Sequence, residues 1–406
     1  MSQCDLPNID AQALNQIQKD RSPLRRKAKK ALYICEKYSL PLILGVVVAL
    51  IWINISPASY NQAVYGEYLG GKNLHYVIND IFMVFFFGIA TVEIVNGFLP
   101  GGQLNPIKKA VNPVLATLGG VAGPALLYLG LNAVIGSPDY VNGWGIVTAT
   151  DIALSWMVAR IIFGERHPII CFLLLLAVLD DALGLAIIAI FYPDPANPVQ
   201  PIFLLLVLAG MLIALILRKK DVRPYWLYLI LGGIPSWIGL SLAHLHPALA
   251  LVFIIPFLPH NVSKKKDRPG ISYSPLIRFP IHFNHFIVFG LFFFAITNAG
   301  VPFSAIGIPT LLVFVALLLG KCLGIFGMST LANTIGFPFP DGVTKKEIFL
   351  VGIVAGMGLT VALFIAAAAF VEPTIQSSAK MGALFSSAAF VIAFIAAKAM
   401  NIRKID

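Results

Sequence analysis

Charged residues are scarce in this sequence. They make up 12% of the 406 residues, whereas hydrophobic residues make up 58%; in a soluble domain about a quarter of the residues are charged. The strand alternation typical of an outer-membrane barrel is also missing. Apolar runs of about 18 to 22 residues recur from residue 40 onwards, and each is long enough to cross ~30 Å of hydrocarbon. The sequence therefore predicts an all-α polytopic membrane protein.

Cysteines are few and the usual ATP-binding loop is absent. The four cysteines, at positions 4, 35, 171 and 322, show no paired spacing, so we expect no disulfide. The chain lacks the Gly-x-x-x-x-Gly-Lys-Ser/Thr loop that cradles ATP phosphates. We therefore expect neither a cofactor nor coupling to ATP hydrolysis.

The apolar runs predict about twelve spans in one transporter domain over residues 41–398. Residues 1–40 form a basic arm, far too long for the charged region of a cleaved signal peptide, and residues 399–406 form a short tail. The expected spans lie near 41–56, 79–99, 111–131, 143–160, 169–191, 201–217, 225–243, 246–259, 281–297, 308–329, 347–370 and 379–398.

The basic residues are distributed unevenly around these spans. If both termini are cytoplasmic, only three of the 29 Lys and Arg residues fall outside cytoplasmic segments: Lys72 and Lys380 are external, and Lys321 lies within a span. This is the positive-inside pattern of membrane proteins. We expect the cytoplasmic clusters, such as residues 264–266, to lie near anionic membrane lipid and not to bind nucleic acid.

Two adjacent carboxylates, Asp180 and Asp181, lie in the middle of the expected fifth span. Ionised groups at this depth are costly, so they usually serve a function; the alternative is a structural pair satisfied by buried donors. At the rise of an α-helix, about 1.5 Å per residue, Asp180 and Asp181 lie ~18 Å from the turn that contains Arg166. Thr150 and Asp151 lie ~14 Å from the same turn. The fourth and fifth spans therefore bring four polar residues to a similar depth.

Two further segments reach this depth. Lys321 lies about 14 Å into the tenth span, where an ammonium must pair, lose its proton or face water. The eleventh span contains Gly356, Gly358 and Thr360. Each glycine weakens a helix by roughly 1 kcal/mol relative to alanine, so this span is either broken in mid-membrane or packed closely through its small residues.

The fourth span offers a counterpart to this interruption at Thr150 and Asp151. If spans three to five and ten to twelve are inverted repeats, two broken helices meet at the midplane, which is the pattern of a transporter ion site. In such a crossing, Asp151 would offset two facing positive helix ends, and Lys321 would offset the negative ones.

These residues make the chain resemble the NhaA-type sodium/proton antiporters. The matching segments are Ile78-Asn79-Asp80, Glu93, Thr150-Asp151, Asp180-Asp181, His246-Pro-Ala-Leu-Ala, Asn298-Ala-Gly-Val301, Leu319-Gly-Lys321-Cys-Leu-Gly324 and Val351 to Thr360.

The resemblance implies crossed, discontinuous fourth and eleventh spans. It implies that Asp181 is the main carboxylate that binds the cation and the proton. It also implies that the pairing of Asp180 with Lys321 changes during the transport cycle, and that Thr150 and Asp151 assist cation binding. It gives lesser roles to Asp80, Glu93 and His246. For His246 the simpler interpretation is a structural histidine at the start of a helix, with its hydrogen bonds satisfied.

The expected activity is antiport of sodium or lithium against protons, by alternating access, for pH and sodium homeostasis. Burial and mutual repulsion of the two carboxylates let protons compete with a cation, and carboxylate, hydroxyl and carbonyl oxygens suit a small cation. Release of two protons for one cation would make the exchange electrogenic. A sodium-coupled organic-anion symporter and a non-transporting membrane sensor or assembly factor are the alternatives.

The resemblance also implies the inner membrane of a bacterium and a possible homodimer. Family members dimerise through an external hairpin. In this sequence residues 64–68 and 74–77, on either side of Gly70-Gly71, would be its short strands.

Overall fold

The computed structural model describes most of the expected transporter domain. The described residues are 30, 34–35, 38–68, 70–100, 107–193, 197–260 and 274–405. Most of the predicted N-terminal arm and the basic cluster at 264–266 lie outside them.

The longer helices follow one another in the order of the expected spans. They are α3 (Leu40–Ile55), α4 (Pro57–Tyr65), α5 (Leu74–Tyr76), α6 (Met83–Phe98), α7 (Ile107–Ile135), α8 (Ile152–Phe163), α9 (Ile169–Phe191), α10 (Leu204–Lys219), α11 (Tyr225–Leu227), α12 (Ile234–Leu242), α13 (Pro275–Asn298), α14 (Ile308–Val315), α15 (Lys321–Thr334), α16 (Lys345–Ala355), α17 (Thr360–Ala369), α18 (Pro373–Phe385) and α19 (Ala389–Ala399).

Short π-helical or 3-10 segments join several of these helices. They are η1 (Val77–Phe82), η2 (Pro138–Thr148), η3 (Pro201–Phe203), η4 (Tyr228–Gly233), η5 (Pro247–Leu249), η6 (Ile255–Phe257), η7 (Phe303–Ala305), η8 (Ala316–Gly320) and η9 (Ser386–Ala388).

The prediction of an all-α polytopic protein is confirmed. Eight helices of the described residues are long and apolar enough to cross a membrane, and the count rises to ten if each of two bent pairs is one span. The 16-residue α3 supplies the first expected span. Apart from the two bent pairs, only the eighth expected span of the described residues, 246–259, is not a continuous helix: it forms η5 and η6 with turns between them. Pro247 and Pro256 cannot donate to a helical ladder, and its buried residues, such as Leu249 and Ile254, keep this irregular backbone within protein.

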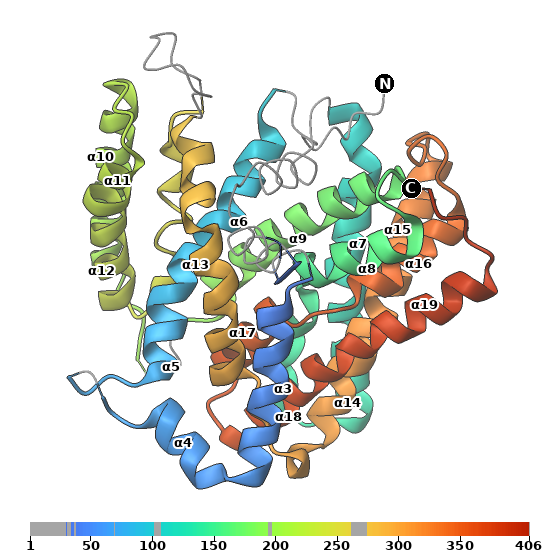
Figure 1. Cartoon of the computed structure of the whole chain (residues 1–406), viewed down its shortest axis with the longest axis horizontal. Coiled ribbons are helices and arrows are strands. Elements are labelled where there is room, and N and C mark those ends of the chain that lie inside the picture. The colour runs from blue at the N-terminus through green and yellow to red at the C-terminus, as the bar shows by residue number, and fades with distance from the viewer. Residues whose placement is uncertain are drawn as a thin grey trace.

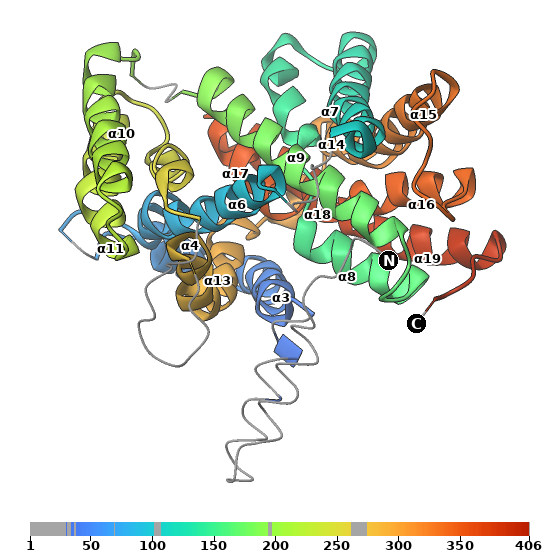
Figure 2. The same cartoon turned by 90° about the horizontal axis from the view of Figure 1, so that it is seen from above.

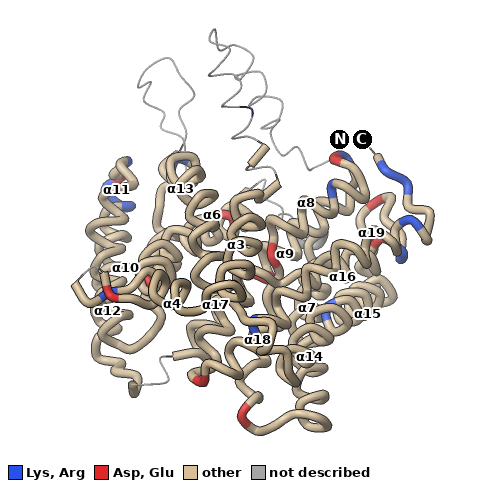
Figure 3. Tube along the Cα trace, turned by 60° about the horizontal axis from the view of Figure 1, so that its bottom comes forward, with Lys and Arg blue, Asp and Glu red and all other residues tan. Residues whose placement is uncertain are grey.

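The helices are arranged around α9, which lies near the middle of the molecule in two perpendicular views (Figures 1 and 2). The flank formed by α10, α11 and α12 lies on one side, and α15, α16 and α19 lie on the other. Basic residues gather mainly toward the end where the C-terminus lies (Figure 3). This distribution agrees with the positive-inside pattern of the sequence.

The fourth and eleventh spans are both broken, as predicted. The axes of η2 and α8 differ by 54°, and those of α16 and α17 differ by 49°. Each broken span lies between two continuous ones in the chain: η2–α8 follows α7 and precedes α9, and α16–α17 follows α15 and precedes α18. Spans three to five and ten to twelve therefore share the same order of elements.

Glycines bring α7 and α15 unusually close together. A Cβ added to Gly119 would lie 2.2 Å from the carbonyl oxygen of Gly324, and one added to Gly320 would lie 2.4 Å from the Cα of Pro124. Small residues permit such close approach of backbones in membrane proteins. These two helices, from the third and tenth spans, carry the packing between the two repeats.

Three expectations are wrong. Lys380 is not external: α18 begins at Pro373, seven residues earlier than Lys380, so this side chain is buried within the twelfth span. Cys171 is disulfide-bonded, which spacing along the chain does not reveal. The expected hairpin strands at 64–68 and 74–77 are also wrong, because α4 extends to Tyr65 and α5 begins at Leu74.

Candidate ion-binding site

One carboxylate joins the ends of two half-helices. Asp151 precedes α8, and its Oδ1 accepts a hydrogen bond from the backbone N–H of Leu154 at 3.1 Å. Its Oδ2 accepts another from the N–H of Thr360, the first residue of α17, at 3.2 Å. The N-terminus of a helix carries partial positive charge and unpaired N–H groups. A single buried carboxylate therefore satisfies the positive ends of both broken spans.

The two interruptions are bonded directly to each other. The N–H of Asp151 donates to the carbonyl of Met357 at 2.7 Å. The hydroxyl of Thr150 donates to the carbonyl of Ala355, the last residue of α16, at 3.0 Å. Gly358 passes so close that an added Cβ would lie 3.0 Å from the carbonyl oxygen of Ala149. These contacts form a rigid crossing of unwound backbone at the centre of the bundle.

Lys321 reaches this crossing from the tenth span. It follows the π-helical η8 as the first residue of α15, and its side chain is fully buried. Its ammonium donates to the hydroxyl of Thr150 and to Oδ2 of Asp180, with which it forms an ion pair. A buried ammonium needs such a partner to offset its desolvation. Thr150 therefore links Lys321 to the negative end of α16 at Ala355.

The two adjacent carboxylates of α9 differ in their surroundings. Asp180 is 1% exposed, and its Oδ1 has no hydrogen-bond partner among the described residues. Asp181 is 9% exposed and accepts no hydrogen bond from the described residues. Glu93, Asp180 and Asp151 all repel a negative charge on Asp181, with Glu93 the strongest of the three, and Lys321 attracts it. Asp181 is therefore the more exposed of the two carboxylates and the one without a bonded partner among the described residues.

Glu93 belongs to the surroundings of this site, whereas Asp80 does not. Glu93 lies on α6 and is exposed, and it is the acid that most strongly repels Asp181. Asp80 lies in η1, half-buried, with its carbonyl oxygen bonded to the indole N–H of Trp237. The two acids are thirteen positions apart in the chain, which corresponds to about 20 Å at helical rise.

The remaining sequence candidates lie at or beside the crossing. Gly356 tolerates no side chain without a shift, because an added Cβ would lie 2.8 Å from the carbonyl oxygen of Leu317. His246 precedes η5, and its ring lies 5.5 Å from that of Phe364 on α17. It therefore packs against the second broken span without a described contact to the carboxylates.

Two serines at the crossing were missed by the sequence analysis. The hydroxyl of Ser155 donates to the carbonyl of Val354 at 3.1 Å. The hydroxyl of Ser386, in η9, accepts from the N–H of Gly358 at 3.0 Å. Both are fully or almost fully buried. A single serine within an apolar run carries no signal that distinguishes such a contact from ordinary packing.

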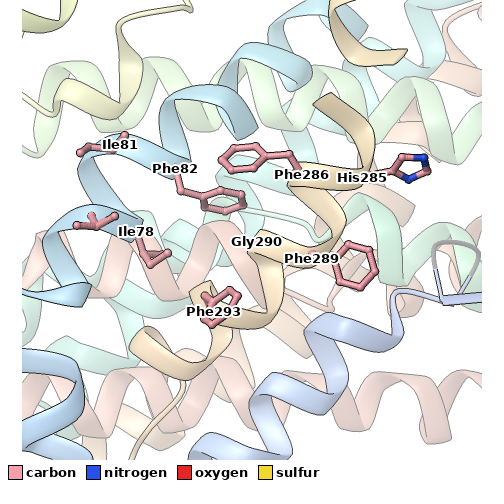
Figure 4. Close-up of a pocket in the computed structure, with 9 residues that line it drawn as sticks. Ile78, Ile81, Phe82, His285, Phe286, Phe289, Gly290 and Phe293 are labelled. Carbon is pink, nitrogen blue, oxygen red and sulfur yellow. The ribbon is translucent and has the colours of Figure 1, made fainter. Parts of the chain in front are cut away.

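A pocket of about 420 Å³ lies away from this site, between η1 and α13. Figure 4 shows its apolar side chains, with Phe82 and Phe286 facing one another and the imidazole of His285 directed away from them. It contains none of the carboxylates and opens on the outer surface of the bundle. It therefore has no part in ion binding.

The donors at the crossing suit a transported cation better than a resident metal. Carboxylate, hydroxyl and carbonyl oxygens are the ligands that small hard cations prefer. The described residues contain no group of three or more His, Cys, Asp or Glu arranged to hold a metal ion. A cation that binds Asp180 beside Asp181 would either use Oδ1, which has no partner among the described residues, or compete with Lys321 for Oδ2. The structure thus places the two carboxylates in different states: one paired, one open.

Several proteins named Na(+)/H(+) antiporter NhaA are similar to this chain over most of its length. The chain is 56% identical to the Na(+)/H(+) antiporter NhaA of Desulfitobacterium hafniense over 381 residues, covering 93% of this chain and 98% of that one. It is 55% identical to the protein of the same name from Geobacter sulfurreducens, covering 93% and 100%, and 38% identical to that of Jannaschia sp., covering 90% and 97%.

A solved structure and a family profile complete the comparison. The sodium proton antiporter MjNhaP1 from Methanocaldococcus jannaschii is 16% identical, with a TM-score of 0.49, over 89% of this chain and 97% of that one. The profile of the family described as Na+/H+ antiporter 1 matches residues 31–398. The resemblance to NhaA-type proteins is thereby confirmed, and the chain belongs to the Na+/H+ antiporter 1 family.

Proposed function

We propose that this protein exchanges sodium or lithium for protons across a bacterial inner membrane by alternating access, and that Asp181, Asp180 and Thr150 hold the ion. It is a secondary transporter and not an enzyme, and its substrates are ions. The observation that carries the site assignment is the pairing of Lys321 with Asp180 beside the open carboxylate of Asp181. Family membership weighs against the organic-anion symporter and the non-transporting sensor or assembly factor.

The contacts of Lys321 support a competition between its ammonium and the transported cation. In the structure Lys321 occupies one oxygen of Asp180 and the hydroxyl of Thr150. A cation that binds Asp181 needs further oxygens, and Asp180 and Thr150 are oxygen donors that Lys321 brings together at the crossing. Displaced from Asp180, a desolvated ammonium tends to lose its proton. Entry of a cation and departure of a proton are therefore linked through the same oxygen.

The surroundings of Asp181 support proton competition at the same place. Three acids repel a negative charge on Asp181, and either a proton or a cation offsets that repulsion, so the two compete for this carboxylate. With either ion bound, the site carries less net charge and crosses the membrane interior more readily than when empty. This difference in energy makes the exchange obligatory. It serves pH and sodium homeostasis.

We further propose that two protons move for each monovalent cation. Lys321 and Asp181 each offer one titratable position, and the cation displaces a proton from both. The exchange would then carry net charge. In vesicles, a membrane potential imposed with potassium and valinomycin should change the exchange rate, whereas an electroneutral exchange would not respond.

The orientation follows from the charge distribution. With both termini cytoplasmic, the basic residues of the described chain lie mainly on the cytoplasmic side, as the positive-inside rule requires. Residues 41–398 then act as one transporter domain in contact with membrane lipid. A homodimer stays a prediction from the resemblance, and the mass of the purified protein in detergent tests it.

The decisive experiment measures a pH gradient in inside-out vesicles. Addition of sodium or lithium should dissipate an imposed gradient, and Asp181→Asn should abolish that response because the amide cannot exchange a proton. Asp139→Asn, an exposed position outside the crossing, is the matched control. A normal response from Asp181→Asn would refute the site, and a silent wild type would refute antiport.

A further inference from the structure

A buried contact between a histidine and a glutamate holds the end of α16 that is remote from the crossing. Nε2 of His167, in the turn between α8 and α9, lies 3.0 Å from Oε1 of Glu347, and the two side chains are only 3% and 9% exposed. The other oxygen of Glu347 accepts from the N–H of Thr344 at 2.6 Å, which closes a capping box at the start of α16. Neither residue has a role in the exchange described above.

The second nitrogen of His167 is also bonded. Nδ1 accepts from the backbone N–H of Ile169, the first residue of α9, at 3.2 Å. A ring nitrogen that accepts carries no proton, so the proton is on Nε2, which donates to Glu347. A second proton would occupy Nδ1, break the bond to Ile169 and place a positive charge at the positive end of α9. Only neutral His167 makes both bonds.

These contacts tie α16 to the α8–α9 hairpin at both ends. Glu347 and Ala355 are eight residues apart, about 12 Å at helical rise. At the far end, the carbonyl of Ala355 accepts from Thr150 and that of Val354 accepts from Ser155. A shift of α16 at Glu347 is therefore transmitted along a short rigid helix to the carbonyl that Thr150 holds beside Lys321.

We propose that His167 and Glu347 are positioning residues for ion exchange, and that the neutral imidazole joins α16 to the first turn of α9, a joint that is lost when a second proton on Nδ1 breaks the bond to Ile169. This inference rests on the proposed ion site, because it acts through Thr150. It makes the cytoplasmic end of the second broken span a proton-sensitive support for the crossing.

Other charged groups near His167 bear on its protonation. The C-terminal tail reaches the same turn, since the N–H of Ile405 donates to the carbonyl of Phe163 at 2.8 Å and its own carbonyl accepts from Arg166 at 3.3 Å. The charged residues on the elements around His167 are Arg160, Glu165 and Arg166 on the α8 side, Lys345, Lys346 and Glu347 on α16, and Lys398, Arg403 and Lys404 on α19 and the tail.

Three variants separate positioning from protonation. His167→Gln supplies one donor and one acceptor, so it keeps both bonds but takes no proton. His167→Ala and Glu347→Ala each remove the pair. Glu372→Ala, an exposed glutamate that bonds its neighbour Thr374, is the matched control. The full-length protein in vesicles is assayed for sodium KM and maximal rate across a pH series, and hydrogen exchange is followed at the amides of α16.

At alkaline pH, both alanine variants should raise the sodium KM about tenfold, the equivalent of one lost hydrogen bond to a charged group. The double variant should be no worse than either single one, because the two residues act as a unit. Hydrogen exchange in the first turns of α16 should become faster. His167→Gln should keep the wild-type KM at alkaline pH and show a flatter rise of KM as the pH falls through the range where histidine titrates.

Other outcomes overturn the proposal. Additive effects in the double variant, an unchanged KM in both alanine variants, or a wild-type pH profile for His167→Gln would each do so. If the alanine variants do not fold, the comparison of His167→Gln with wild type still decides. The hydrogen-exchange result is independent of the ion site, so a failure of the Asp181 assignment and a failure of this support are distinguishable.

Discussion

Asp180 and Asp181 are neighbours in the chain but have different partners. Counting residues from the cytoplasmic turn predicts that they share a depth with Thr150 and Lys321, and the structure brings Lys321 onto Thr150 and Asp180. The sequence cannot tell which carboxylate takes the ammonium. Successive helical residues point about 100° apart, and the rotation of α9 about its axis is decided by packing against the whole bundle.

Thr150 is the residue whose loss tests the link between Lys321 and α16. Thr150→Val keeps the shape of the side chain but removes the hydroxyl that accepts from Lys321 and donates to Ala355. We expect the sodium KM to rise about tenfold, the effect of one lost hydrogen bond to a charged group. Thr150→Ser should restore most of the affinity. The measurement is the rate of sodium-driven proton movement against sodium concentration in vesicles.

Thr334 provides the control for this change. It is exposed at the end of α15, and its hydroxyl bonds only the carbonyl of Leu331 in the same helix. Thr334→Val should leave the sodium KM unchanged. An equal KM for Thr150→Val and wild type would show that the hydroxyl takes no part in binding.

Lys380 is a second ammonium inside the bundle, and the sequence analysis placed it outside. It is 4% exposed, and no acid among the described residues forms an ion pair with it. A buried charge without a partner carries a desolvation cost that an apolar side chain of similar size does not. We therefore expect Lys380→Met to raise the Tm in detergent by at least about 2 °C. Lys398→Met, exposed on the same span, should not. A lower Tm for Lys380→Met would contradict this.

At the scale of elements, the two broken spans were predicted on different grounds. Glycines in the eleventh span indicated either a break or close packing, and the structure has both: the helix stops at Ala355 and resumes at Thr360, and the glycines between them touch neighbouring backbone. The fourth span breaks without glycine, where Asp151 caps α8. Hydropathy alone did not reveal that prolines would prevent a continuous eighth span.

Gly358 tests whether the crossing needs this close approach. An added Cβ would lie 3.0 Å from both the carbonyl oxygen of Ala149 and a methyl group of Leu317, so Gly358→Ala should destabilise the fold by about 1–3 kcal/mol and slow exchange. Gly327→Ala is the control, because a Cβ there meets nothing within 4 Å; it should be neutral or slightly stabilising. Thermal unfolding in detergent compares the two, and equal Tm values would argue against a tight crossing.

At the scale of the whole molecule, topology was the most predictable property. The spans follow from hydropathy, and charge predicts an orientation that stays a prediction, since the cost of moving lysine and arginine into or across lipid depends little on the details of packing. The pairing of α7 with α15 and the tail contact with the α8–α9 turn were not predictable. Both depend on backbone fit between segments distant in the chain.

The orientation is checked with reporter fusions. Alkaline phosphatase is active only on the periplasmic side, so a fusion after residue 406 should be inactive and one in the turn at 136–137, between α7 and η2, should be active. A fluorescent protein that folds only in the cytoplasm should give the opposite pattern. Activity of phosphatase at the C-terminus would reverse the proposed topology.

The glycine contact between α7 and α15 has a consequence for the evolution of this chain. Gly119 and Gly324 each leave no room for a methyl group because the other backbone occupies it. Neither position can gain a side chain unless the two helices separate, and separation would draw Lys321 away from Thr150 and Asp180. Mutations at this seam are therefore selected for their effect on the geometry of a site some distance away, even though no glycine there ever touches an ion.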